Sequence, residues 1–262
     1  MFMAIDVGNT NVAIGVHDHS RWIARWRIST SSTRTADEWA AVISELLHLA
    51  NLTTDHIDHI GISSVVPSVT TELRNMAVCH FHLDPFVVAP GVRTGIQILT
   101  DNPKEVGADR VVNALATREK YGGPAIVVDF GTATTFDVIS KEGNYIGGAI
   151  APGIVISAEA LRRFTAKLHE VELVPPPKPI GKNTVEAMQS GIVLGYAAMV
   201  NGLVAAIHEQ VGPCKVIGTG GLVGVVSQAT KIFDYIDPDL TIDGIRFMYY
   251  LNTPKPEESL HE

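Results

Sequence analysis

The 262-residue chain contains little cysteine, which limits how it can be stabilised. Its two cysteines, Cys79 and Cys214, are too few for a disulfide framework and show no CxxC spacing, so a disulfide scaffold and a cysteine-based metal site are excluded. We expect both to be small apolar fillers. A signal-peptide pattern is also missing, because Asp6 interrupts the first apolar run. Together these absences favour the cytoplasm.

Positive charge is scarce as well. Lys and Arg number 20 against 28 Asp and Glu, which leaves a formal charge of −8 and argues against a surface that tracks the phosphate backbone of a nucleic acid. No uninterrupted apolar run reaches the roughly 20 residues that a membrane span requires. We therefore expect neither a nucleic-acid partner nor a membrane. An acidic protein can still bind a phosphorylated small molecule through backbone amides and cations.

The remaining pattern is that of an α/β protein. Short apolar runs predict strands on either side of a turn at residues 8–11, and apolar residues at helical spacing predict an amphipathic helix over 35–50. The proline-rich segment 174–179 favours a rigid surface connection. Other predicted strands cover 21–29 and 57–66, and other predicted helices 154–164 and 184–210. The tail from Thr253 is expected to be frayed and solvated.

The opening pattern returns half a chain later. An apolar strand, Asp-x-Gly, a small polar turn and a second apolar strand occur at Asp6 and again at Asp129, 123 residues further on. A cluster of helix-breaking residues, Tyr121-Gly122-Gly123-Pro124, lies between the copies. We therefore expect two related halves, residues 1–120 and 121–262.

Each Asp-x-Gly turn suits a phosphate with its metal ion. Glycine lets the backbone approach, Thr and Asn add donors, and the carboxylate holds a cation. One such turn is more simply explained as an ordinary hairpin with an Asx-turn, but two copies favour the phosphate site. A third glycine-rich turn at 218–221 adds an edge to the same predicted site. Asn183 breaks a Walker pattern and Val223 a dinucleotide fingerprint, so both rival motifs fail.

A second candidate segment covers residues 101–116. Asn102, Pro103 and Glu105 are typical of a helix start, although Gly107 could delay it. In either case Asp109 and Arg110 fall in an early helical turn. They form either a surface ion pair or a functional pair, with Asp109 as a general base and Arg110 binding an anionic group.

The histidines at 80 and 82 have alternate spacing that could chelate a metal. No third ligand follows at a plausible spacing, so we interpret them as ordinary loop or strand histidines.

With these motifs assembled, the chain resembles the type III pantothenate kinases of the acetate/sugar kinase and actin-like superfamily. The resemblance runs from Ala4 to Thr241. Its motifs are the first phosphate loop Asp6-Val7-Gly8-Asn9-Thr10, the substrate segment Gly107-Ala108-Asp109-Arg110, the second phosphate loop Asp129-Phe130-Gly131-Thr132-Ala133-Thr134-Thr135 and the adenosine loop Gly218-Thr219-Gly220-Gly221.

The resemblance implies a duplicated ribonuclease-H-like (actin-like ATPase) fold, with two halves and a central cleft. It implies a homodimer that uses ATP to convert pantothenate into 4′-phosphopantothenate, the first step towards coenzyme A. The implied cofactors are ATP with Mg²⁺ and a monovalent cation, K⁺ or NH₄⁺.

The resemblance also implies roles for individual residues. Asp109 would accept the proton of the pantothenate hydroxyl, Asp129 would hold the monovalent cation, and Asp6 would hold magnesium. The residues implied to bind pantothenate are Gly107, Ala108, Asp109, Arg110 and Thr184. Those implied to bind ATP are Asp6, Val7, Gly8, Asn9, Thr10, Asn11, Val12, Ala13, Thr132 and Gly220. Many members have Tyr where this chain has Thr100, a departure that affects one pantothenate contact.

Two other functions share part of this pattern. Another kinase of the superfamily, or a polyphosphate phosphatase, would keep the Asp-x-Gly turns without the Gly-Ala-Asp-Arg segment. A non-catalytic regulator of transcription would be expected to have lost a phosphate-loop acid or the base. Asp6, Asp109 and Asp129 are all present, which favours the enzyme.

Overall fold

The computed structural model describes residues 1–165 and 168–253 and divides into two compact units. The first unit comprises residues 1–97, 102–116 and the segment that begins at Thr241, and the second comprises 98–101 and 117–240. The units do not coincide with the expected halves 1–120 and 121–262, because the last helix, α8 (Leu240–Asn252), belongs with the first unit.

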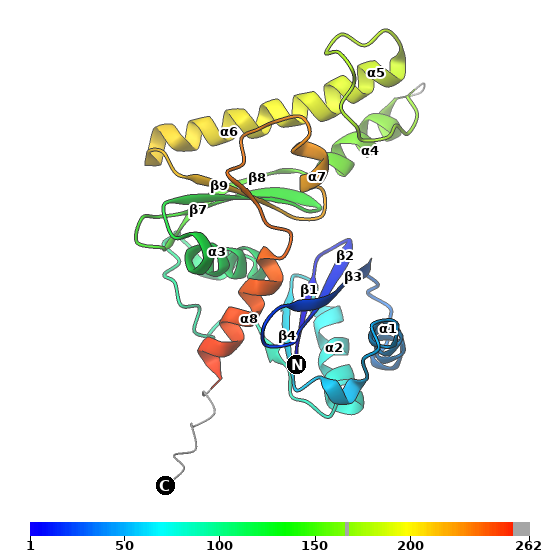
Figure 1. Cartoon of the computed structure of the whole chain (residues 1–262). Coiled ribbons are helices and arrows are strands. Elements are labelled where there is room, and N and C mark those ends of the chain that lie inside the picture. The colour runs from blue at the N-terminus through cyan, green and yellow to red at the C-terminus, as the bar shows by residue number, and fades with distance from the viewer. Residues whose placement is uncertain (166–167, 254–262) are drawn as a thin grey trace. The chain divides into compact units, whose positions relative to one another are not determined.

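The first unit contains a five-stranded mixed sheet of order β3-β2-β1-β4-β5 (Figure 1). β1, β2 and β3 pair antiparallel, whereas β4 and β5 join parallel to β1 and to each other. The strands are β1 (Phe2–Val7), β2 (Asn11–His17), β3 (Trp22–Ser29), β4 (His59–Ser64) and β5 (Phe86–Val87).

The second unit repeats this sheet. Its order, read from β8, is β8-β7-β6-β9-β10, with the same antiparallel and parallel pairings. An irregularity interrupts the register of β2 with β3 at Val16/His17, and one interrupts β7 with β8 at Val138/Ile139. The strands are β6 (Ala125–Phe130), β7 (Ala133–Ile139), β8 (Tyr145–Pro152), β9 (Lys215–Thr219) and β10 (Tyr235–Ile236). The predicted duplication is therefore confirmed at the level of topology.

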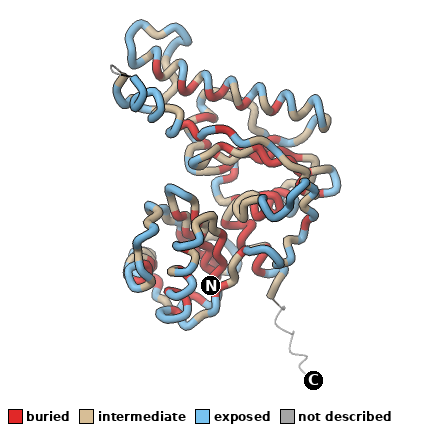
Figure 2. Tube along the Cα trace, turned by 180° about the vertical axis from the view of Figure 1, so that it is seen from behind, coloured by how far each residue is buried: buried red, intermediate tan, exposed pale blue. Residues whose placement is uncertain are grey.

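The strands β1 and β6 share one burial pattern. Five of their six residues are buried, and the exception is Asp6 in one and Asp129 in the other. Figure 2 shows the buried residues gathered along the strands of each sheet. Apolar runs of this kind form central strands with both faces covered. The less buried position near the end of each strand is thus left to a carboxylate.

Two helices cover one face of the first sheet, α1 (Ala36–Leu49) and α2 (Pro67–His80). α1 begins as predicted, because Thr35 and Glu38 form a capping box. α2 was not predicted: Pro67 ends the strand region and also opens a helix, a position that suits proline because its missing N–H needs no partner there.

α2 corrects two expectations. His80 is the last residue of this helix and not a loop or strand residue, and its Nε2 lies 2.8 Å from Asp37 Oδ1. Cys79 is exposed on the same helix, so it is not an apolar filler; Cys214 is half-buried.

α8 covers the opposite face of the first sheet and needs glycines to do so. A Cβ on Gly61 would lie 2.7 Å from Ile245 Cγ2, and one on Gly15 would lie 2.8 Å from Ile242 Cδ1. α8 also meets α3 (Ala108–Tyr121), where a Cβ on Gly244 would lie 2.1 Å from the carbonyl oxygen of Val112. Close contact between backbones therefore sets the position of α8 within the first unit.

One long helical stretch covers a face of the second sheet. Residues 184–211 form α5 (Thr184–Gln189), a π-helical turn (Ser190–Leu194) and α6 (Gly195–Val211), close to the predicted helix 184–210. By length and composition this is the one described helix that could cross a membrane, and such a helix is weak evidence because core helices pass the same test. Its inner residues, among them Val193, Val200 and Val204, belong to the second hydrophobic core. The compartment stays a prediction.

The other helical elements are short or lie at the ends of the sheets. α4 (Ile154–Phe164) forms over the predicted range. The remaining elements are α7 (Val223–Val226) and the 3₁₀ turns Thr54–His56 and Pro103–Glu105. Residues 174–179 carry no helix or strand. The expected frayed tail lies outside the described residues from 254 onward.

Candidate active site

The first phosphate loop is a tight hairpin between β1 and β2. Gly8 N–H donates to the Asn11 carbonyl at 2.9 Å, so Asn9 and Thr10 form the exposed tip. Thr30 holds the loop from β3's side: its hydroxyl donates to the Gly8 carbonyl at 2.7 Å, and its N–H donates to the Thr10 carbonyl at 3.0 Å. The loop is therefore anchored by its own backbone hydrogen bond and by the hydroxyl and N–H of Thr30.

Not every residue expected to bind ATP here can use its side chain. Val7 and Val12 are 1% and 0% exposed and belong to the first hydrophobic core, so only their backbone is free for a ligand. Asp6, Gly8, Asn11 and Ala13 are half-buried.

The second phosphate loop is one residue shorter than the first. Gly131 N–H donates to the Ala133 carbonyl at 3.1 Å, and Thr132 is exposed. Gly153, directly after β8, donates its N–H to the Thr132 carbonyl at 3.1 Å. A Cβ on Gly153 would lie 2.1 Å from that oxygen, so the corner after β8 fits tightly against the loop.

The third glycine-rich turn lies against the second phosphate loop within the second unit. Gly220 has φ +87°, and a Cβ there would lie 2.4 Å from Asp129 Oδ1 and 2.6 Å from the Phe130 nitrogen. Only glycine fits this position without strain. Asp129 therefore lies directly against the Gly220 backbone. A carboxylate is an oxygen ligand of the kind that a hard cation prefers, so the chemistry of Asp129 is compatible with the expected monovalent cation.

The substrate segment opens α3. The 3₁₀ turn Pro103–Glu105 stops short of Gly107, and α3 begins at Ala108, which puts Asp109 in its first turn. A Cβ on Gly107 would lie 2.5 Å from Asp109 Oδ1, so glycine leaves room for the carboxylate. The same oxygen accepts the Arg110 N–H at 2.9 Å.

Burial raises the pKa of Asp109 above its ordinary value of 3.8, against the lowering effects of the Arg110 N–H and the Arg110 charge. A carboxylate with a raised pKa is a better proton acceptor. Arg110 is half-buried beside it. This environment favours the functional pair over the exposed ion pair.

Two further residues differ in their surroundings. Thr184 is exposed in the first turn of α5, where Asn183 caps the helix by accepting the Glu186 N–H at 2.9 Å. The Oγ1 atom of Thr100 is buried without a hydrogen-bond partner among the described residues.

Sequence reasoning missed the hydroxyl of Tyr196. It lies on the buried face of α6, donates to the Pro152 carbonyl at 3.0 Å and is hydrogen-bonded to Thr134 Oγ1 in the second phosphate loop. The sequence does contain a hint of this contact. Tyr196 falls on the core-facing side of a predicted apolar helix, where a buried hydroxyl needs a hydrogen-bond partner.

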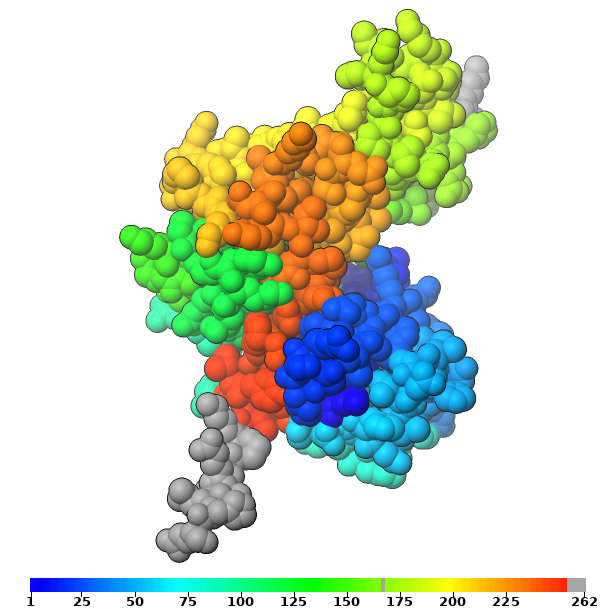
Figure 3. Space-filling model, in the orientation of Figure 1, coloured from blue at the N-terminus to red at the C-terminus, as the bar shows by residue number. Residues whose placement is uncertain are grey.

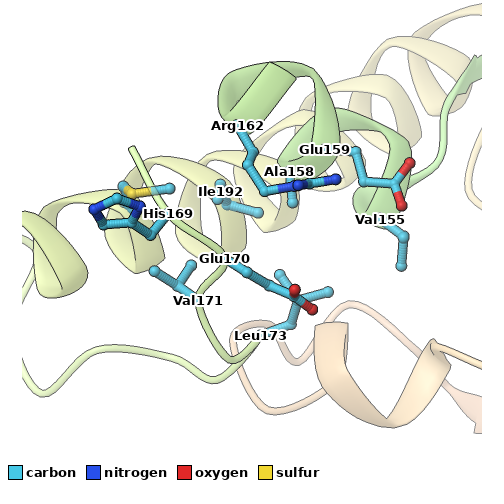
Figure 4. Close-up of a pocket in the computed structure, with 10 residues that line it drawn as sticks. Val155, Ala158, Glu159, Arg162, His169, Glu170, Val171, Leu173 and Ile192 are labelled. Carbon is cyan, nitrogen blue, oxygen red and sulfur yellow. The ribbon is translucent and has the colours of Figure 1, made fainter. Parts of the chain in front are cut away.

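A cavity of about 190 Å³ lies elsewhere in the second unit (Figure 4). It is bordered by α4, by residues 169–173 and by the α5 end of the long helix, and none of the predicted site residues lines it. Within the part of the chain that the structure describes, no group of three or more His, Cys, Asp or Glu side chains is placed to hold a metal.

Two sheets of identical strand order, each with an Asp-x-Gly turn after its first strand, define an α/β protein of the duplicated actin-like ATPase fold. A family model described as type III pantothenate kinase matches residues 2–206. The chain belongs to the type III pantothenate kinase family and is a phosphotransferase.

Curated relatives from the same family align with nearly the full length of this chain. A type III pantothenate kinase of Exiguobacterium sibiricum is 48% identical over 96% of this chain and 100% of its own length. One from Roseiflexus castenholzii is 49% identical over 96% and 99%. One from a Geobacillus species is 47% identical over 98% and 100%.

Solved structures support the fold at low sequence identity. A Baf family protein from Campylobacter jejuni, described as a transcriptional activator, has a TM-score of 0.61 at 18% identity and covers 95% of this chain and 98% of its own. Component A of (R)-2-hydroxyglutaryl-CoA dehydratase from Acidaminococcus fermentans has a TM-score of 0.55 at 14% identity, covering 95% and 96%.

Proposed function

We propose that this protein transfers the γ-phosphoryl group of ATP to the hydroxyl of pantothenate, with Asp109 as the general base. The observation that carries the proposal is the half-buried Asp109 carboxylate at the start of α3, whose pKa burial raises. Such a group accepts a proton from a substrate hydroxyl as the phosphorus–oxygen bond forms. Arg110, next in the chain, is suited to a substrate carboxylate because its guanidinium binds carboxylates in a fork.

ATP would be bound by the two phosphate loops and the adenosine loop. Residues 6–13 and Thr132 offer backbone and hydroxyl donors, and Gly220 lets the chain approach closely. The transition state of phosphoryl transfer is loose, so most of the catalysis comes from positioning and charge neutralisation. Magnesium supplies part of that neutralisation when bound, and Asp6 would help to hold it. Asp129, against Gly220, would hold K⁺ or NH₄⁺.

A homodimer is part of the proposal, and the apolar surface of the second unit supports it. Large apolar side chains are exposed on α4 and near the start of α5. Figure 3 shows these two segments gathered at one end of α6. The exposed side chains are Val155, Ile156, Leu161, Phe164, Ile180 and Val185, here called the apolar end. Exposed apolar patches of this kind mark interfaces. A cytoplasmic location and a contact of Thr184 with pantothenate complete the proposal.

The test is an ADP-release assay with purified protein, ATP and Mg²⁺. We expect turnover with pantothenate, little with other small hydroxylated acids, and a requirement for K⁺ or NH₄⁺. Equal turnover with the other acids would point to another kinase of the superfamily. No pantothenate-dependent ADP release under any cation would favour a non-catalytic regulator.

A further inference from the structure

We propose that Tyr196 is a positioning residue for ATP: its hydroxyl ties the second phosphate loop to the corner after β8. This inference rests on the proposed function, because it assumes that the loop receives ATP. Tyr196 would act on the loop through its hydrogen bonds to Thr134 and Pro152.

The hydrogen-bond directions follow from a count of protons. The Tyr196 hydroxyl has one hydrogen, which it donates to the Pro152 carbonyl at 3.0 Å. The Thr134 hydroxyl must therefore donate to the Tyr196 oxygen. The result is a directed chain from Thr134 through Tyr196 to Pro152, and each bond in such a chain strengthens the next.

Two of the three residues are buried, whereas Pro152, which accepts through its backbone carbonyl, is exposed. Thr134 is 1% exposed and Tyr196 is 6% exposed. Burial raises the pKa of the Tyr196 phenol above its ordinary value of 10.0, so the hydroxyl keeps its proton at neutral pH. A buried hydroxyl that loses its partner carries a desolvation cost, which makes this arrangement strongly preferred.

The chain of hydrogen bonds acts at both ends of the loop. Thr134 pairs with Phe130 across the loop, so its position sets the far side of the turn that contains Thr132. Pro152 pairs with Ala133, and Gly153 next to it donates to the Thr132 carbonyl. Tyr196 thereby fixes the backbone on either side of Thr132 from α6, a helix of the second core.

The place of Tyr196 on its helix agrees with this role. The π-helical turn Ser190–Leu194 lies immediately before α6 and changes the direction in which the following residues face. π-helical turns occur frequently at functional sites. Here the residue that faces the loop directly after the turn is Tyr196.

The experiment compares Tyr196→Phe with the wild type in steady-state kinetics. We expect the KM for ATP to rise about five- to tenfold, the range that follows from losing one buried hydrogen bond. The KM for pantothenate should stay within about twofold, because the altered loop does not carry the substrate segment. A merely structural role would lower thermal stability without this split between the two KM values.

Control variants separate the loop from general damage. Tyr121→Phe removes another hydroxyl of the second unit, which donates to Asp237 Oδ2 at 2.8 Å, and should leave both KM values unchanged. Thr134→Val should reproduce the effect of Tyr196→Phe, Thr134→Ser should restore the wild-type value, and the double variant should be no worse than either single one. If Tyr196→Phe does not fold, the Thr134 pair still decides the question.

The outcomes are distinguishable from failure of the proposed function. If the wild type shows no pantothenate-dependent ADP release, the proposed function fails first. If the wild type is active and neither Tyr196→Phe nor Thr134→Val changes the KM for ATP, the positioning role is overturned and the kinase assignment stands.

Discussion

The proposed role of Asp109 as a base would link catalysis and stability in one carboxylate. Its pKa is raised by burial, so the folded protein favours the protonated form relative to the unfolded chain. The carboxyl therefore stabilises the fold below the unfolded pKa of about 4. This contribution to the free energy of unfolding is lost as the pH rises through the higher folded pKa. At neutral pH the ionised base is therefore a stability cost.

We predict that Asp109→Asn lowers kcat by about 10²–10⁴-fold, the usual contribution of a general base. The amide keeps an oxygen that can accept the Arg110 N–H, so ATP binding should change little. The variant should also be more stable than the wild type at pH 7, and the difference should shrink as the pH falls through the raised folded pKa and vanish below about 4. Steady-state kinetics and urea unfolding at several pH values measure both effects. Near-normal turnover would rule out the base assignment.

The wild-type pH profile gives a second view of this residue. The acidic limb of kcat/KM should fall as the pH decreases through the raised pKa of Asp109, above its ordinary 3.8.

Asp129 carries a separate prediction. Asp129→Ala removes the carboxylate beside Gly220 and should abolish the response to K⁺ together with most of the activity. Potassium titrations of the variant and of the wild type, at fixed Mg²⁺, measure this. An unchanged potassium response would place the cation elsewhere.

At the scale of elements, glycine decides which backbones can meet. Gly244 on α8 lies against the Val112 carbonyl of α3, and that oxygen belongs to a helix and cannot move aside. We predict that Gly244→Ala lowers the free energy of unfolding by about 1–3 kcal/mol, the usual cost of overpacking. Chemical denaturation measures it.

Gly202 offers the matched control. It lies on α6, and a Cβ there meets no atom within 4 Å. Gly202→Ala should instead raise stability by about 0.5–1 kcal/mol, because alanine is the better helix former. Equal effects of both substitutions would show that the α3–α8 contact is not tight.

The elements also show what could be read from the sequence. The β1 and β6 hairpins were predictable because a long apolar run, an acid and a glycine turn repeat in each half, and Thr35 marked α1 through its capping box. α2 could not be read, since its mean hydropathy and periodicity are weak and Pro67 resembled a stop. α8 gave no local sign that it packs with the first unit, because that contact depends on Gly15 and Gly61, far away in the chain.

Some residues of the candidate site could likewise be predicted from the sequence, and others could not. Aspartates beside glycines carry their chemistry in the local sequence, and Asp129, Gly220 and Asp109 were identified from it. Tyr196 acts across the fold, through hydrogen bonds to Thr134 and Pro152 that sequence spacing does not encode.

At the scale of the whole molecule, the apolar end of the second unit predicts association. Phe164 is 82% exposed on α4, and we expect Phe164→Glu to shift the protein from dimer towards monomer because a charge cannot be buried unpaired in an interface. Analytical ultracentrifugation measures the shift. Leu49→Glu is the control: Leu49 is 71% exposed on α1 of the first unit, and its replacement should leave the dimer intact. A monomeric wild type would contradict the prediction.

The return of α8 to the first unit affects how the protein is made on the ribosome. One face of the first sheet stays uncovered until Leu240–Asn252 has been synthesised, so the N-terminal unit cannot finish folding when its own strands emerge. At roughly 5–20 residues per second, translation of residues 117–240 adds a delay on the order of 10 s. During that time the second sheet can form completely. The unit whose synthesis begins first is therefore the last to complete its folding.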